Sequence, residues 1–344
     1  MEPTPSKANA DKIASQLGLQ NSEHYHITHD PDDIWEDSRV IVNIGPTHPA
    51  MHGALRMVAR LNGETIEKSY CEFGFTHRAK EKLGEHRSYH QFIVYTDRLN
   101  YCSALINNVT YAMAVERLMG VTVPERCVWI RMICCELARV IDHLICVGIN
   151  AVDLGAFSFF LYGFHQREQA YTLIEKLCGA RLTTSYTRVG GLMADLPPNY
   201  CEELLEILAK VEHEVVEVDK LLTRNRIFVD RLIGVGKLSQ ADALQWGVTG
   251  PFLRSTGIDY DVRKDAPYMF YDQVDFDVPI GSHGDNYDRY LCRLEEIKQS
   301  ARLIRQIVKH LEEPGPINAP DWRYVLPPKQ EVYNSIEGMM GHFK

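Results

Sequence analysis

Two histidines four residues apart are the first residues of this sequence that point to chemistry. His48 and His52 lie in "NIGPTHPAMHGALR", residues 43–56, directly after the apolar run "VIVNI". Residues four apart share one face of a helix, but Pro49 between them disfavours a helix here. The pattern instead predicts a strand, a turn and a return strand over "ALRMVARL", with His52 at the tip of the loop. An imidazole in that place can bind a ligand or exchange a proton near neutral pH.

Charged residues also interrupt a long apolar segment, "PERCVWIRMICCELARVIDHLICVGINAV". Glu136 and Arg139 are three residues apart, and Arg139 and His143 are four apart, so the three share one helix face. Buried charges are usually paired, so we predict a structural ion pair among them that fixes helix packing. Asp153 follows between apolar runs without a basic neighbour in the sequence. Taken alone, it is a helix cap or core residue as readily as a site residue.

Composition excludes several classes of function. The chain has 344 residues, 45% of them hydrophobic, and a net charge of -9 without a Lys/Arg block, so we expect a globular protein that binds no nucleic acid. Its nine cysteines form no C-x-x-C pair, which argues against iron–sulfur or nickel ligation by this chain. The sequence contains no G-x-G-x-x-G, P-loop, H-E-x-x-H or G-x-S-x-G motif. Redox metals and a nucleotide site therefore belong elsewhere, and no metal is expected here.

The pattern along the chain predicts a mainly α fold with a small N-terminal β portion. We expect a polar arm at 1–36, a β region with the histidine loop at 37–70, and a helical core at 71–344. Residues 200–232 are predicted to form one regular helix, and 248–290 a long ordered loop with short strands. The apolar stretch 143–164 is long enough to span a membrane, but a central Asp costs several kcal/mol in lipid. It is better explained as a buried helix broken near Asp153.

Several blocks of the sequence resemble a known family. These are "NIGPTHPAMHGALR", "THRAKEK", "YTDRLNY", "AVDLGA" and "YDQVDFDVPIGSHGDNYDRYLCRLEEIKQS". In order, and from about residue 40 onward, they are similar to the quinone-site subunit of respiratory complex I. This is the D subunit of bacterial NADH:quinone oxidoreductase and the 49-kDa subunit in mitochondria. The resemblance implies the helical bundle of the related nickel–iron hydrogenase large subunits. Relatives continue beyond "HFK", so we expect the chain to be incomplete at its C-terminus.

The resemblance implies roles for single residues. His52 projects from the hairpin loop into a quinone cavity, and Tyr101 at the end of "TDRLNY" faces it. Asp153 in "AVDLGA" hydrogen-bonds to His52, so these three residues are the expected catalytic group. His48 on the same hairpin loop is expected to bind the quinone as well. Arg78 in "THRAKEK" lies near the terminal [4Fe–4S] cluster of a neighbouring subunit. Ala79 stands where the family pattern favours Gly.

The resemblance also implies the setting. We expect the quinone-reduction subunit of a proton-translocating NADH:quinone oxidoreductase, which binds no cofactor itself while [4Fe–4S], FMN and NADH sit in neighbouring subunits. Expected partners are the iron–sulfur subunit with the terminal cluster, other peripheral-arm subunits and a membrane-arm subunit at the quinone entrance. The expected location is peripheral, on the cytoplasmic face of the bacterial plasma membrane. Two alternatives stay open: a nickel–iron hydrogenase-type large subunit, which needs two cysteine pairs, and a non-catalytic scaffold of the same fold.

The residue at position 183 leads to the first prediction. Many relatives have a His where Thr183 stands near the cluster, and that His is associated with a pH-dependent cluster potential. Thr does not titrate, so the reduction potential of this cluster should vary little with pH. The potential should also be lower than in relatives with a His, because no imidazolium stabilises the reduced cluster. A low potential suits a low-potential acceptor such as menaquinone. Potentiometry of the assembled complex measures this, and a slope near one proton per electron contradicts it.

Overall fold

The computed structural model describes residues 39–343. The predicted polar arm at 1–36 lies outside the described residues. The described residues divide into two compact units on either side of the boundary between Lys82 and Leu83, and each is described by itself.

The first unit is built on a three-stranded antiparallel sheet in the order β1-β2-β3. Its strands are β1 (Arg39–Ile44), β2 (Arg56–Asn62) and β3 (Thr65–Glu72). Val58 and Ala59 in the central strand are fully buried. Ile44 pairs with Met57 at the end of the β1–β2 ladder, so residues 45–55 form the loop that carries both histidines. The predicted strand, turn and return strand are confirmed.

Gly45 closes the base of this loop. Its φ is +91°, a conformation that residues with a Cβ rarely adopt. A Cβ added to Gly45 would also lie 1.9 Å from the carbonyl oxygen of Leu55, which is far inside van der Waals contact. Only glycine at position 45 therefore allows this conformation of the loop between β1 and β2.

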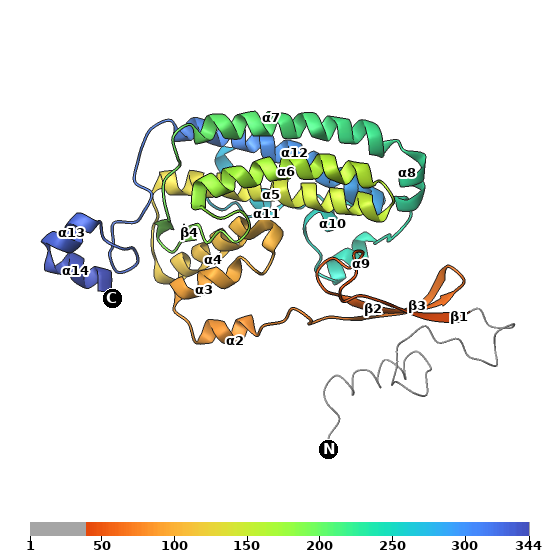
Figure 1. Ribbon diagram of the computed structural model, residues 1–344. Coiled ribbons are helices and arrows are strands. Elements are labelled where there is room, and N and C mark those ends of the chain that lie inside the picture. The colour runs from red at the N-terminus through yellow and green to blue at the C-terminus, as the bar shows by residue number, and fades with distance from the viewer. Residues whose placement is uncertain (1–38, 344) are drawn as a thin grey trace, which may run out of the picture. The chain divides into compact units, whose positions relative to one another are not determined.

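The second unit is a helical bundle (Figure 1). Helix α2 (Lys80–Glu85) spans the boundary between the units. The longer helices that follow are α3 (Tyr89–Thr96), α4 (Ala104–Met119), α5 (Glu125–Asp153), α6 (Phe157–Cys178), α7 (Tyr200–Val218) and α12 (Asn286–Val308). The shorter helices are α8 (Arg226–Leu232), α9 (Gln240–Gln245), α10 (Gly250–Arg254), α11 (Val262–Asp265), α13 (Lys329–Asn334) and α14 (Ile336–Phe343). A two-residue hairpin, β4 (Thr187–Arg188) and β5 (Gly191–Leu192), follows α6.

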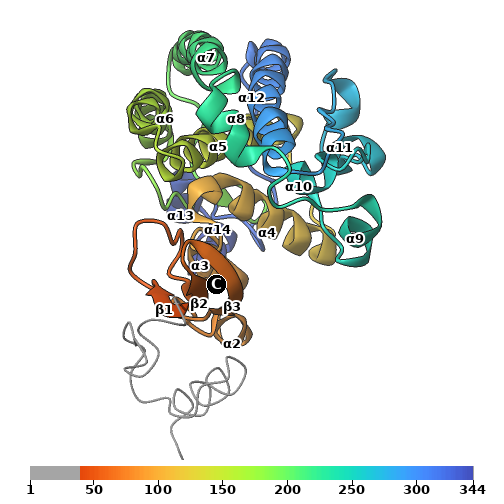
Figure 2. The ribbon, with the colours of Figure 1, turned by 90° about the vertical axis from the view of Figure 1, so that its right-hand side faces the viewer.

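Helix α5 is the centre of the bundle, with α6, α7 and α12 gathered around it (Figure 2). Nineteen of its 29 residues are buried. A helix that is buried on nearly every side must lie inside a large core, because neighbours have to cover each face. One apolar cluster joins α5 to α6, α7 and α12 around Ile133 and Leu137, and a second does so around Val140 and Leu144. This placement explains why "LICVGINAV" on α5 is so apolar.

The expected fold class, mainly α with a small N-terminal β portion, is confirmed. Gly120 ends α4 and Gly179 ends α6, both in the left-handed conformation that favours glycine at helix ends. The apolar stretch 143–164 breaks after Asp153, where α5 ends, and three residues separate it from the start of α6. Among residues 39–343, no helix is both long enough and apolar enough to cross a membrane.

Three predicted elements were wrong in detail. The single helix at 200–232 is α7, a π-helical turn at Asp219–Thr223, and then α8, which starts anew because the Asn225 side chain accepts the Ile227 N–H. Residues 248–285 contain the short helices α10 and α11, and within this described stretch there is no strand. The segment "EVYNSIEGMMGHFK" also has the sequence pattern of one helix, but the chain forms α13 and α14 there, because Ser335 has extended backbone.

We predict that Gly45→Ala destabilises the first unit by more than about 3 kcal/mol, since it adds both left-handed strain and a backbone clash. Gly63→Ala is the matched control, because Gly63 also has a positive φ of 60° but nothing lies within 4 Å of its added Cβ. The control should cost only about 1 kcal/mol. Limited proteolysis of the hairpin in the full chain measures both, and equal sensitivity of the two variants contradicts the role given to Gly45.

Candidate functional site

The histidine loop presents both imidazoles on the surface of the first unit. His48 is exposed, and its Nδ1 accepts the N–H of Ala50 at 3.1 Å. The His48 carbonyl accepts the N–H of Met51 at 2.9 Å. His48 thus organises a tight turn around Pro49, and its ring is partly used in doing so. His52 follows directly after the turn and is exposed, as a residue that meets a ligand must be.

Tyr101 lies in the second unit, where it begins a 3₁₀ turn before α4. Its side chain is 51% exposed. Beside it is a crevice of about 10 Å³ lined also by Tyr171 of α6 and by Ala138 and Ile141 of α5. This space is roughly that of one water molecule, so the second unit by itself holds no chamber for a quinone ring at Tyr101.

A fully buried carboxylate, Asp97, holds the segment that leads to Tyr101. It accepts hydrogen bonds from the Ser185 hydroxyl at 2.6 Å and from the Ser185 backbone N–H at 3.2 Å. The neighbouring Thr184 hydroxyl donates to the Asn108 side chain of α4 at 3.1 Å. A buried charge held by several donors is a rigid anchor, because releasing it costs its full desolvation. The motif "YTDRLNY" thus contains an anchor as well as the tyrosine.

Thr183 precedes this anchored pair and is half-buried. Leu182 and Thr184, on either side of it, both line the crevice beside Tyr101. The structure therefore brings position 183 and Tyr101 to the same part of the second unit, although 82 residues separate them in the sequence.

Asp153 is the last residue of α5 and is exposed. The helix ends there because Gly155 takes a φ of +93°. The Arg231 guanidinium of α8 donates to the Leu154 carbonyl at 2.7 Å, which satisfies a helix-end acceptor beside Asp153. Asp153 is twelve residues beyond Ile141 on α5, or about 18 Å along the axis. Tyr101 lies beside α5 at the level of Ile141, whereas Asp153 lies at the end of α5. The two residues therefore do not form one cluster.

Arg78 lies in the first unit, on the exposed segment between β3 and α2. The residue after it, Ala79, has a φ of +50°. This is the left-handed conformation, so glycine would be the easier residue at position 79. Ala79, which stands where the family pattern favours Gly, therefore lies at a position where the backbone conformation disfavours a side chain.

Glu136 and Arg139 are paired, with 3.3 Å between the Arg139 Nε and a Glu136 oxygen. The fully buried Glu136 carboxylate also accepts from Arg263 at 3.1 Å, from Tyr271 at 2.6 Å and from Ser300 at 2.7 Å. Burial by itself raises the pKa of Glu136, but the two guanidinium groups and two hydroxyls outweigh it and lower the pKa to about 2.

His143 does not join that pair, contrary to the sequence-based expectation. Its Nε2 lies 2.6 Å from a Glu296 oxygen on α12. Glu296 also accepts from the Arg254 Nε at 3.0 Å. Burial raises the pKa of Glu296, whereas His143 and Arg254 outweigh burial and lower the pKa to about 2.

Asp261 joins the two groups into one network. It lies 2.7 Å from Arg263 and 3.6 Å from Arg254, and all three side chains are buried. Acidic and basic groups therefore alternate from Glu136 to His143 and link α5, α12 and the segment 254–263. The sequence signals the α5 members, because they interrupt an apolar helix. It gives no sign of which distant arginine meets which carboxylate.

Comparison with known proteins decides the family. Residues 153–344 match the family model described as "Respiratory-chain NADH dehydrogenase, 49 Kd subunit". A D subunit of the NADH-quinone oxidoreductase of Anaeromyxobacter dehalogenans is 50% identical over 305 residues, covering 89% of this chain and 71% of the relative. The chain belongs to the 49-kDa subunit family of respiratory-chain NADH dehydrogenases.

Other members of the 49-kDa family agree. A D subunit of the NADH-quinone oxidoreductase of Sorangium cellulosum is 51% identical, covering 89% of this chain and 76% of the relative. The C/D subunit of the same enzyme in Bdellovibrio bacteriovorus is 47% identical, covering 96% of this chain and 59% of the relative. The resemblance inferred from the motifs is confirmed, and the chain is a subunit of an NADH-quinone oxidoreductase.

The 49-kDa family member described here does not gather metal ligands in its described part. Within residues 39–343 there is no group of three or more His, Cys, Asp or Glu side chains placed to hold a metal ion. The nine cysteines are free thiols, and four of them are buried.

We predict that the buried network makes this 49-kDa subunit acid-sensitive. The lowered pKa values of Glu136 and Glu296 mean that each carboxylate stabilises the fold above about pH 4.5 and loses that contribution as pH falls towards 2. Each should contribute about 3 kcal/mol to the free energy of unfolding. Glu136→Gln should cost about 3–5 kcal/mol at pH 7, because it leaves buried arginines unpaired.

Urea unfolding of the full chain between pH 2 and 7 measures this dependence. Glu217→Gln is the matched control, since Glu217 is an accessible carboxylate paired only with Lys220 and should cost less than about 1 kcal/mol. If Glu136→Gln keeps the wild-type dependence on pH and costs no more than the control, the account of the network is wrong.

Proposed function

We propose that this chain forms the quinone-reduction site of a proton-translocating NADH:quinone oxidoreductase. His52 and Tyr101 bind the two carbonyl oxygens of the quinone, and Asp153 orients the His52 ring. Both donors are accessible, and Asp97 holds the Tyr101 segment rigidly. Asp153 is spaced well away from Tyr101 along α5, which suits a carboxylate that acts on the histidine rather than on the quinone. Membership in the 49-kDa family is the observation that carries the proposal.

The chemistry explains the residue types. A quinone that accepts two electrons needs two protons to become a neutral quinol, and the unprotonated dianion is unstable in an apolar cavity. The Tyr101 O–H and a His52 ring N–H are each able to donate a hydrogen bond and then a proton. Asp153 stabilises the N–H tautomer of His52 and raises its basicity. Proton loss from His52 changes the charge balance around Asp153, and we propose that this change couples to proton translocation.

The electrons come from a [4Fe–4S] cluster in a neighbouring iron–sulfur subunit. We place Arg78 and Thr183 near that cluster. A cation at Arg78 stabilises the more negative, reduced cluster by direct electrostatic attraction. Thr183 shares its part of the second unit with Tyr101, which supports a short path from cluster to quinone. An uncharged Thr183 favours a low cluster potential and hence menaquinone as the acceptor.

The proposed setting follows from the family. The chain packs against the iron–sulfur subunit, other peripheral-arm subunits and a membrane-arm subunit at the quinone entrance, on the cytoplasmic face of the bacterial plasma membrane. NADH and FMN bind in other subunits. The name of the Bdellovibrio relative joins the letters C and D in one protein, which supports a C subunit as one neighbour of this chain.

We predict that Tyr101→Phe and His52→Ala each lower NADH:quinone reductase activity of the assembled complex by roughly 100-fold or more, since each removes a proton donor. Asp153→Asn should mainly shift the pH profile, because it acts through His52. Tyr333→Phe is the matched control, since Tyr333 is 81% exposed on α13 and should leave activity unchanged. NADH oxidation with an artificial electron acceptor should stay normal in every variant. A non-catalytic scaffold predicts full quinone reductase activity in both Tyr101→Phe and His52→Ala.

A further inference from the structure

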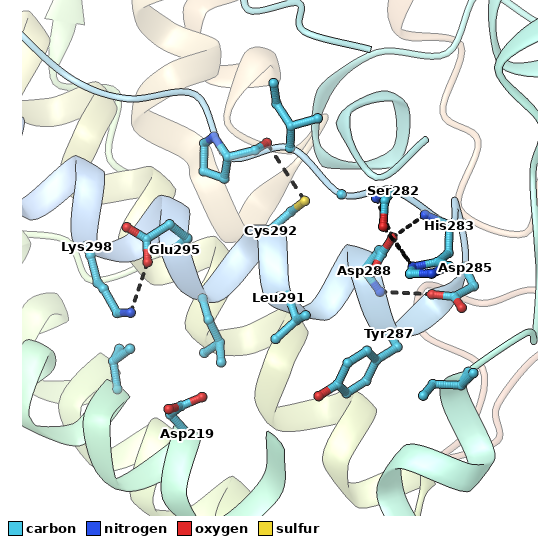
Figure 3. A pocket seen from close by; sticks show the side chains of 16 residues that line it. Asp219, Ser282, His283, Asp285, Tyr287, Asp288, Leu291, Cys292, Glu295 and Lys298 are labelled. Atoms are coloured by element: carbon cyan, nitrogen blue, oxygen red, sulfur yellow. Dashed lines mark hydrogen bonds and ion pairs between the residues drawn. The ribbon is translucent and has the colours of Figure 1, made fainter. Parts of the chain in front are cut away.

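A groove of about 680 Å³ runs along α12 in the second unit, and the proposed quinone chemistry does not use it. It lies between the outer face of α12, the end of α7 and the loop at 279–285 (Figure 3). The α12 wall and this loop belong to residues 271–300, the longest block of the family resemblance. The proposed quinone site uses no residue of this block.

The floor of the groove is apolar. Tyr287, Leu291 and Leu294 are spaced by four and three residues, so they form one stripe along α12. Ile233 and Ile280 stand on the rims and are 54% and 45% exposed. Apolar side chains gathered in a concave surface and left open to water mark a binding surface.

The charges around this floor are mostly acidic. Four carboxylates line the groove against one lysine and one histidine: Asp219, Asp285, Asp288, Glu295, Lys298 and His283. Three carboxylates already have partners in the fold. Asp285 accepts the N–H of Gly234, Asp288 accepts that of Ser282, and Glu295 pairs with Lys298 at 2.9 Å.

Asp219 differs from these three. It is exposed at the start of the π-helical turn, and its side chain makes no hydrogen bond or ion pair with any residue in 39–343. In Figure 3 its carboxylate stands across the groove from Leu291 and Tyr287. An unpaired carboxylate above an apolar floor favours a cation on an otherwise apolar partner.

We propose that the groove docks a segment of a neighbouring subunit of the same complex, with a Lys or Arg that pairs with Asp219 and aliphatic side chains that cover Leu291 and Ile280. An anionic lipid headgroup fits poorly, because the lining is acidic. A second copy of this chain also fits poorly, because its net charge is -9 and its own groove is acidic. The inference requires membership in a multisubunit enzyme but not the His52–Tyr101 chemistry.

The first test is photo-cross-linking in the intact complex. A benzophenone amino acid at position 280 should cross-link to a Lys- or Arg-containing peptide of another subunit, identified by mass spectrometry. The same probe at Val262, which is 47% exposed on α11 outside the groove, should not give that product. Cross-links only within this chain, to a second copy or to lipid overturn the proposal. Complexes with Tyr101→Phe should keep the cross-link, so failure of the quinone site and failure of the docking site are distinguishable.

The second test is charge reversal. Asp219→Lys should make the intact complex dissociate about tenfold faster in moderate salt, and Asp219→Asn should have a smaller effect. Within residues 39–343 the Asp219 side chain makes no hydrogen bond or ion pair, so its variants should fold. Asp259→Lys is the matched control, since Asp259 is also exposed and lies outside the groove. If complexes with Asp219→Lys dissociate no faster than complexes with Asp259→Lys, the proposal is wrong.

Discussion

The buried carboxylate of Glu136 is the constraint on which the second unit most depends. Two guanidinium groups and two hydroxyls converge on it from three parts of the chain, and Asp261 extends the contacts to Arg254 and Glu296. A charge buried without these partners would cost several kcal/mol, so α5, α12 and the segment 254–273 must keep one register. This network fixes α5 in the bundle. The crevice beside Tyr101, which α5 lines, and Asp153 at the end of α5 therefore have fixed positions in the second unit.

A second buried carboxylate links the two ends of the proposed electron path. Asp97 holds Ser185, two residues after Thr183, which we propose to lie near the cluster, and it lies four residues before the tyrosine that we place at the quinone. Structural rigidity matters here, because proton donation requires hydrogen-bond distance at the moment of reduction. The apolar helices supply bulk stability, whereas a few buried charges position the groups that we propose to react.

The groups that we propose to react lie in separate parts of the chain. His52 stands on a loop of the first unit, closed at its base by Gly45, whereas Tyr101 and Asp153 belong to the second. The crevice of about 10 Å³ at Tyr101 means that the second unit by itself does not provide the quinone chamber. The acidic groove along α12 is a second such place, since no residue in 39–343 pairs with the Asp219 side chain and we propose that a neighbouring subunit does so.

The sequence by itself determined the family, the mainly α fold, the histidine hairpin and the break near Asp153. These depend on local periodicity, on backbone conformations that only certain residues adopt, and on contiguous motifs. Only the tertiary structure decided that His143 pairs with Glu296, that Asp97 anchors the loop at 184–185, and that the helix predicted at 200–232 breaks at a π-helical turn. The first two are contacts between residues distant in sequence, and periodicity carries no information about which distant partner a buried charge will meet. The third is a local change of helix type followed by the Asn225 cap, which an unbroken apolar period does not reveal.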